Sequence, residues 1–284
     1  MPSETMPPRP AGTAGRDDAG VPAWPDDGLP PVIARRLRMT AGLVAAIYAP
    51  CLFLVLAATF ARYPNGLAIP GDPAWHFPYA FTNQVNTLAM AWLAVFAVAN
   101  LGQGRLAQAA RRLVRQGLVT GLMLCLAVMF LSVSCVLNPF YTGAFEAVLS
   151  GGGLYLHICT PIVVLTLYLL YPWPDRATWR SLLGWIGYLA VYVGVVNLVG
   201  SRVSWRGGER AYAYSFLDPS VYPSPGVYVA VILGLLVAAF GLGVGLLRLK
   251  ARFDAGFRPG AAQADGGALP LSRTAQNARQ VAPQ

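Results

Sequence analysis

Charged side chains are scarce in this sequence. Only 12% of its 284 residues are charged, whereas 56% are hydrophobic, and the charges lie in short stretches between long apolar runs. A soluble globular domain carries about twice that share of charged residues. The composition therefore excludes an ordinary soluble domain and indicates a membrane protein.

Cysteine and histidine are also rare, with four and two residues respectively. All four cysteines fall in apolar runs, where a thiol behaves mainly as a small hydrophobe, so we expect no disulfide framework. No Cys-x-x-Cys or His-x-x-x-His spacing predicts a zinc site, and the single histidine within the apolar runs cannot supply both axial ligands of a haem. A Walker loop and a glycine fingerprint between strand and helix are absent as well. The sequence therefore predicts no metal and no cofactor.

Long uncharged runs make up most of the remaining chain. A bilayer core about 30 Å thick needs about 20 apolar residues per helix. Six windows of that length occur, and only Arg202, at the end of the fifth, brings a charge into one of them. They cover residues 39–60, 79–101, 117–137, 153–171, 182–203 and 227–247. The sequence thus predicts an all-α polytopic membrane protein, with a six-helix membrane domain at residues 35–250.

The two ends of the chain lack an apolar period. Residues 1–34 are rich in Pro, Gly, Ala and Asp, and residues 251–284 are rich in Gly, Ala, Gln and Arg. Such compositions are typical of disorder, so we expect a disordered tail at each end. The first apolar run begins far from Met1 and is long enough to span, so we expect no signal peptide.

The arginines predict the orientation of the helices. They precede the first window, separate the second from the third and the fourth from the fifth, and follow the sixth. By the positive-inside rule, both termini and these loops are cytoplasmic. The same distribution explains the net charge of +9 by the orientation of the helices in the membrane. We therefore expect no nucleic-acid partner, and the lipid bilayer is the expected partner. Lys250 is the only lysine among the 21 basic residues, a bias typical of a GC-rich bacterial genome, so we expect the bacterial inner (plasma) membrane.

Polar residues within the windows gather at one depth, in the outer halves of the second, third, fourth and fifth predicted helices. Polar side chains in hydrocarbon are costly unless they face partners or water, so four helices that offer them at one depth predict a shared cavity open to the outside. Thr82 and Asn86 are four residues apart and so share a helix face. The polar residues are Thr82, Asn83, Gln84, Asn86, Thr87, Ser132, Ser134, Cys135, His157, Thr160, Asn197 and Ser201.

Two of these residues suggest chemistry. His157 is the one residue in the windows that can accept a proton near neutral pH, although a neutral histidine can equally bridge two helices through a hydrogen bond. Thr82 can act as a nucleophile if a base takes its proton, whereas the structural alternative is a hydroxyl bonded to the preceding turn. At about 1.5 Å per residue, both lie within about 6 Å of the outer boundary, so they could meet.

Four short segments resemble a known family in their order and spacing. They are Phe81-Thr82-Asn83, then Leu156-His157 followed by Pro161, then Ile186-Gly187-Tyr188, and finally Tyr214-Ser215-Phe216-Leu217-Asp218-Pro219. From about Thr40 to Leu249 the chain resembles the androgen-induced-gene family of six-helix proteins. Animal members are intramembrane threonine hydrolases that cleave fatty acid esters of hydroxy fatty acids. The resemblance implies that Thr82 is the nucleophile and His157 the base. Animal members end the segment equivalent to Phe216-Leu217-Asp218 with glutamate, and the polar run after Thr82 differs here.

These observations lead to a hypothesis of lipid (fatty acyl) ester hydrolysis in an outward-opening pocket. Thr82 attacks the ester carbonyl, and His157 accepts its proton and returns one to the leaving alcohol. Asn83 or Asn86 donates hydrogen bonds to the oxyanion. Asp218 either orients His157 or, as part of an Asp-Pro pair, forms a turn. Alternatives from other classes are a small-solute transporter that uses the same cavity, and a regulatory protein that binds partners through its tails.

Overall fold

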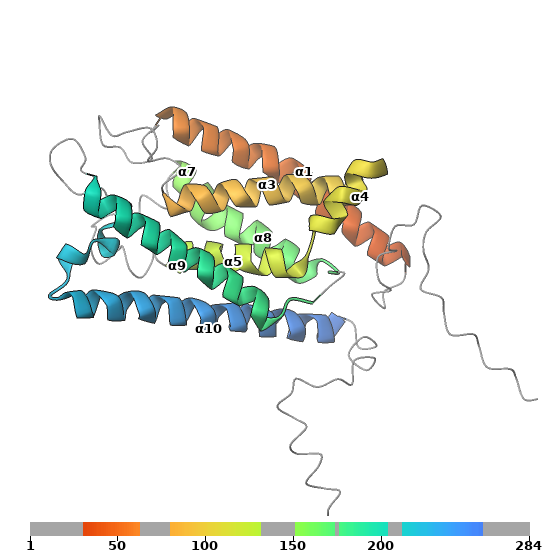
Figure 1. The fold of residues 1–284 in the computed structure, drawn as a ribbon. Helices are drawn as coiled ribbons and strands as arrows, with labels where there is room; N and C mark the ends of the chain where they lie inside the picture. Colours follow the sequence, from red (N-terminus) through yellow and green to blue (C-terminus); the bar gives the residue numbers. More distant parts are fainter. Residues whose placement is uncertain (1–30, 63–79, 132–150, 174–175, 204–211, 258–284) are drawn as a thin grey trace, which may run out of the picture.

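The chain forms a bundle of long helices packed side by side (Figure 1). The computed structural model describes residues 31–62, 80–131, 151–173, 176–203 and 212–257, and within these ranges it contains helices and turns but no strand. The long helices are α1 (Pro31–Arg62), α3 (Phe81–Leu101), α5 (Gln116–Leu131), α8 (Thr160–Leu170), α9 (Trp179–Arg202) and α10 (Pro225–Phe257). The short elements are α4 (Gly104–Leu113), α7 (Gly151–Leu154), the π-helical turn η2 (Tyr155–Cys159) and the 3-10 turns η3 (Ser215–Leu217) and η4 (Pro219–Val221).

The described residues carry five helices that are long and apolar enough to cross a membrane, or six if α4 and α5 form one broken span. Helices α4 and α5 meet at a bend of 61°. The prediction of an all-helical protein with the helices of a polytopic membrane protein is confirmed at this level. The third predicted window, 117–137, is described only as far as Leu131, and the inward or outward direction of each helix stays a prediction.

Both ends of the membrane domain differ from the predicted boundaries. Helix α1 begins at Pro31 rather than after residue 34, and proline is favoured at a first helical position because its missing N–H would have no helical partner. Helix α10 continues to Phe257, so residues 251–257 are helical and not part of a disordered tail. The i,i+4 ion pair of Lys250 and Asp254, 2.6 Å between Nζ and Oδ1, supports this extension. The rest of both predicted tails lies outside the described residues.

Successive long helices run in opposite directions, so their ends gather at two ends of the bundle (Figure 1). At one end α3 and α10 begin and α9 finishes, close to η3 and η4; at the other end, which we call the arginine end, α5 and α9 begin and α10 finishes. Helix α5 is central: it contacts α3, α8, α9 and α10, and ten of its 16 residues are buried. Aliphatic side chains such as Ile47 and Val237 are 67% and 72% exposed on the outside, as a surface in contact with lipid requires.

Lys250 joins two helices at the arginine end. Its side chain is 1% exposed, and its ammonium donates to the carbonyls of Leu169 at 2.9 Å and Tyr171 at 3.3 Å, as well as to Asp254. These carbonyls close helix α8, where the last carbonyl groups have no partner within the helix. A lysine that the sequence assigns to a cytoplasmic segment is therefore a buried cap that fastens α10 to α8.

Candidate functional site

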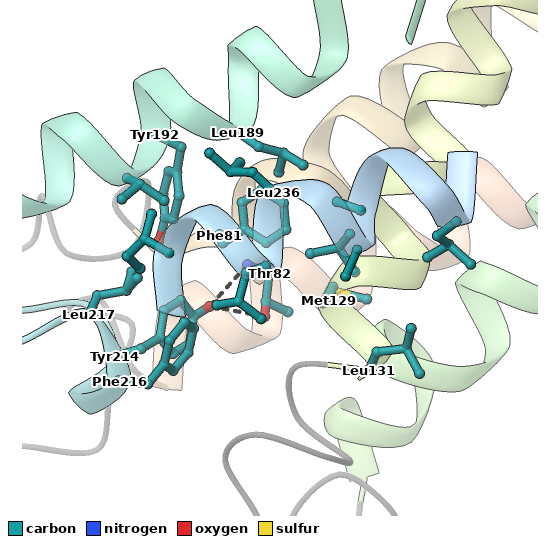
Figure 2. Close-up of a pocket in the computed structure, with 17 residues that line it drawn as sticks. Phe81, Thr82, Met129, Leu131, Leu189, Tyr192, Tyr214, Phe216, Leu217 and Leu236 are labelled. Carbon is teal, nitrogen blue, oxygen red and sulfur yellow. Dashed lines mark hydrogen bonds between the residues drawn. The ribbon is translucent and has the colours of Figure 1, made fainter. Parts of the chain in front are cut away.

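An apolar cavity of about 320 Å³ opens between α3, α5, α9, α10 and η3. Its walls are aliphatic and aromatic side chains, among them Leu189, Leu236 and Phe216, and Figure 2 shows them surrounding Thr82. We call this cavity the apolar pocket. A volume of this size lies at the lower end of the range for small-molecule sites, and the composition of the walls suits a hydrocarbon chain.

Two hydroxyl groups meet at one place in the wall of the apolar pocket. The Thr82 Oγ1 lies 3.3 Å from the Tyr214 Oη, with either oxygen as the donor, and the Thr82 backbone N–H donates to the same Tyr214 oxygen over 3.3 Å (Figure 2). We call Thr82 and Tyr214 the hydroxyl pair. Since Thr82 lies in the first turn of α3 and the N-cap residue Ala80 offers no side-chain acceptor, Tyr214 supplies an oxygen to the start of this helix.

Contacts within the segment before α10 hold Tyr214 at this position. Its ring stacks on that of Phe216 with centroids 5.6 Å apart, and the Tyr222 hydroxyl donates to the Phe216 carbonyl over 2.8 Å. Asp218 caps η4 by accepting from the Ser220 N–H at 2.8 Å. Asp218 thus makes the turn that an Asp-Pro pair favours, and its carboxylate accepts a hydrogen bond within this turn rather than from His157.

Tyr214 is suited to donate a hydrogen bond and not to accept a proton. Burial raises the pKa of the Tyr214 phenol above its usual value, against smaller opposing contributions from its hydrogen bonds to α3. A phenol with a raised pKa stays neutral in the physiological range. Its oxygen already accepts from the Thr82 N–H, so its own proton is available for Thr82 Oγ1 or for a carbonyl oxygen of a ligand.

His157 lies in the π-helical turn η2, between α7 and α8. Pro161, at the start of α8, has no N–H to donate to the carbonyl of residue 157, and its ring would clash with that carbonyl in a regular helix. The wider π-helical turn accommodates the proline ring and the missing hydrogen bond, and the Thr160 hydroxyl donates to the Tyr155 carbonyl at 3.0 Å. Such turns occur frequently at functional sites.

His157 and Thr82 do not form a hydrogen bond in this structure. The His157 Nδ1 is buried and has no hydrogen-bond partner among the described residues, and His157 is not part of the wall of the apolar pocket. Helix α3 and η2 are neighbours in the bundle. The predicted nucleophile and base therefore lie on neighbouring elements, but only Thr82 reaches the pocket.

Asn83 and Asn86 are not among the residues that line the apolar pocket. Asn86 is completely buried, and its amide donates to the Thr82 carbonyl at 2.8 Å and to the Met129 sulfur at 3.6 Å. Its Oδ1 is buried without a partner within the described part of the chain. Asn83 is 5% exposed. Tyr214, which offers its hydroxyl beside Thr82, lies between two predicted spans and therefore outside the windows whose polar residues predict the cavity.

No family model, no curated protein and no solved structure matches this chain. The resemblance to the androgen-induced-gene family therefore stays a prediction. Within the described ranges, no group of three or more His, Cys, Asp or Glu side chains could hold a metal ion. Cys51, Cys125 and Cys159 are free thiols, and Cys135 lies outside the described residues.

Proposed function

We propose that this protein is an integral membrane hydrolase of lipid (fatty acyl) esters, with the acyl chain in the apolar pocket and the ester group at the hydroxyl pair. One observation carries the proposal: a hydroxyl nucleophile and a neutral hydrogen-bond donor meet in the wall of a cavity whose other lining residues, apart from Tyr192, have apolar side chains. A lipid ester has two parts that match this arrangement: a long apolar chain that suits the cavity and a polar carbonyl group that suits the hydroxyl pair.

The start of α3 favours the negative charge that develops during ester cleavage. The first N–H groups of a helix carry partial positive charge, and the Thr82 N–H already binds an oxygen, that of Tyr214. A carbonyl oxygen that takes the place of the Tyr214 oxygen at this N–H, with the Tyr214 hydroxyl turned to donate to it, would receive two hydrogen bonds. Donors placed in this way stabilise an oxyanion, and removal of one typically lowers kcat about 100-fold to 1,000-fold.

Thr82 is the proposed nucleophile. Its Oγ1 attacks the ester carbonyl carbon, its proton passes to a base, and the bond to the alcohol breaks as that alcohol takes up a proton. This leaves the acyl group on Thr82, from which water then releases it as a fatty acid. His157 is the proposed base. It has to move toward Thr82, and the π-helical turn is the element that would rearrange.

Labelling with a fluorophosphonate probe tests the nucleophile. Purified protein in detergent is compared with Thr82→Ala, His157→Ala and, as a matched control, Thr87→Ala, which removes an exposed hydroxyl from the same helix. We expect labelling of the wild type and of Thr87→Ala, and none of the other two variants. Equal labelling of Thr82→Ala, folded as judged by its melting temperature, would exclude Thr82 as the nucleophile.

A second candidate function is lipid binding without chemistry. The partner of Thr82 is a neutral phenol and not a base, and such a pair can hold a carboxyl or ester group by hydrogen bonds alone. A fatty acid with a photoreactive tail should then cross-link to the pocket, while the fluorophosphonate leaves the wild type unlabelled. No contact among the described residues specifically favours the transporter or the regulatory alternative.

A further inference from the structure

A second cavity, of about 500 Å³, lies at the arginine end of the bundle, where α4 meets α5 and α9 begins. Three arginines line it: Arg112 and Arg115 from the junction of α4 and α5, and Arg176 from the segment before α9. Thr178 and Ser181 add two hydroxyl groups, and no acidic residue is part of its described lining. We call this cavity the basic pocket. Its chemistry is that of a site for an anion with several oxygens.

The start of α9 adds to the positive character of the basic pocket. Thr178 is the N-cap of this 24-residue helix, and its side chain makes no capping hydrogen bond. Ser181 donates instead to the Thr178 carbonyl over 2.6 Å. Cap positions of long helices bind anions because the first N–H groups point outward, and here three arginines line the same cavity as the cap residue. Arg115 is held in place by its Nε, which donates to the Arg112 carbonyl at 3.1 Å.

The walls of the basic pocket are fixed by contacts between α5 and α9. The Gln116 side chain, 6% exposed, accepts a hydrogen bond from the Ala177 N–H at 3.1 Å and so ties the two helix starts together. The Trp185 indole lies against Gly121, where any side chain on the glycine would collide with the ring. The α5 and α9 walls are therefore already in place before an anion binds, so little affinity is lost to ordering them.

Helix α4 indicates where the basic pocket lies relative to lipid. It carries Arg105, Arg111 and Arg112 on a strongly amphipathic ten-residue helix, and its Leu106 and Leu113 side chains are 72% and 59% exposed. It turns away from α5 by 61° (Figure 1). A short helix with arginines beside exposed leucines is typical of a segment in the plane of the membrane surface. A segment of that kind would place the adjoining basic pocket at the depth of the lipid headgroups.

We propose that the basic pocket binds the phosphate group of an acidic phospholipid of the inner leaflet. Guanidinium groups bind phosphate oxygens in pairs, and basic pockets between membrane helices on the cytoplasmic side are suited to anionic headgroups. The apolar part of the rim, Leu113, Leu118 and the Trp185 ring, lies beside the arginines and fits the glycerol and first methylene groups of a lipid. A soluble phosphate offers the same oxygens but uses none of this apolar rim.

Thermal stability of the full chain in neutral detergent tests this proposal. Phosphatidylglycerol and phosphatidylcholine are titrated into separate samples and compared, and inorganic phosphate is titrated in a third arm. The test variant is Arg112→Gln with Arg115→Gln and Arg176→Gln. The control is Arg105→Gln with Arg248→Gln and Arg252→Gln, which removes the same charge from exposed positions outside the cavity.

We expect phosphatidylglycerol to raise the melting temperature of the wild type and of the control saturably, and its apparent affinity for the test variant to fall at least about tenfold. Phosphatidylcholine should have no such effect. Equal loss in both triple variants would show general surface attraction and overturn the proposal. Inorganic phosphate could instead stabilise the wild type saturably, as strongly as phosphatidylglycerol does and with the same three arginines required. That result would assign the site to a soluble anion and overturn the lipid assignment.

Discussion

Lys250→Met is the substitution whose effect on stability the structure specifies best. The change keeps the length of an unbranched side chain and removes the ammonium group that caps α8. The Leu169 and Tyr171 carbonyls then lose their donor in a place where Lys250 is 1% exposed, so water cannot easily replace it. Asp254 is 36% exposed and can be rehydrated, so its lost ion pair adds little.

Each hydrogen bond from a charged donor is worth about 1.5 to 3 kcal/mol, so the loss of two should destabilise the fold by about 3 to 6 kcal/mol. At about 2 to 4 °C per kcal/mol for a protein of this size, we expect the melting temperature in detergent to fall by roughly 10 °C. Arg248→Met is the control, since Arg248 is exposed on the same helix and should change the melting temperature by little. A Lys250→Met protein that melts with the wild type would refute the capping argument.

Four further predictions concern the pockets and the packing between them. Gly121→Leu should displace the Trp185 indole and lower the melting temperature by several degrees, because overpacking in a tight core costs about 1 to 3 kcal/mol. Tyr214→Phe should lower ester hydrolysis about 100-fold, since it removes one oxyanion donor, and should lower the melting temperature by a few degrees, since the Thr82 N–H loses its acceptor; unchanged hydrolysis would exclude the donor role. Burial raises the pKa of Tyr214, so the unfolded chain loses this proton first, and stability should fall above about pH 10 in the wild type but less in Tyr214→Phe, as followed by melting temperature against pH. Ala239→Trp should fill the apolar pocket and abolish cross-linking of a photoreactive fatty acid, without lowering lipid binding at the basic pocket.

The helices could be predicted from the sequence because a single physical requirement, about 20 apolar residues per crossing, determines them. Their ends were less predictable. Helix α10 continues past its apolar window because the Lys250 ammonium binds the end of α8 and Asp254. These contacts form only in the folded bundle, so the sequence does not predict them. The bend between α4 and α5 likewise depends on tertiary packing, although Arg111 and Arg112 marked the connection as polar.

The candidate site could be predicted only in part. The depth and residue type of Thr82 predict a site residue, and Thr82 does line a pocket. Asn86 shares its helix face by spacing, yet its side chain turns back to the Thr82 carbonyl, a local choice that spacing does not determine. Tyr214 lies in a segment between spans, and nothing in the sequence pairs that segment with the start of α3. For His157, the extra residue of a π-turn rotates the following side chains by about 100°, so regular helical spacing predicts its direction poorly.

Hydrolysis of a long-chain fatty acyl ester by the purified protein in lipid nanodiscs tests the central claim most directly. Wild type, Thr82→Ala and Thr87→Ala are compared at equal amounts of folded protein, with release of fatty acid as the readout. We predict release by the wild type and by Thr87→Ala, and none above background by Thr82→Ala. Release that survives the loss of Thr82, or its absence from a folded wild type that binds the acyl chain, would contradict the proposed hydrolase.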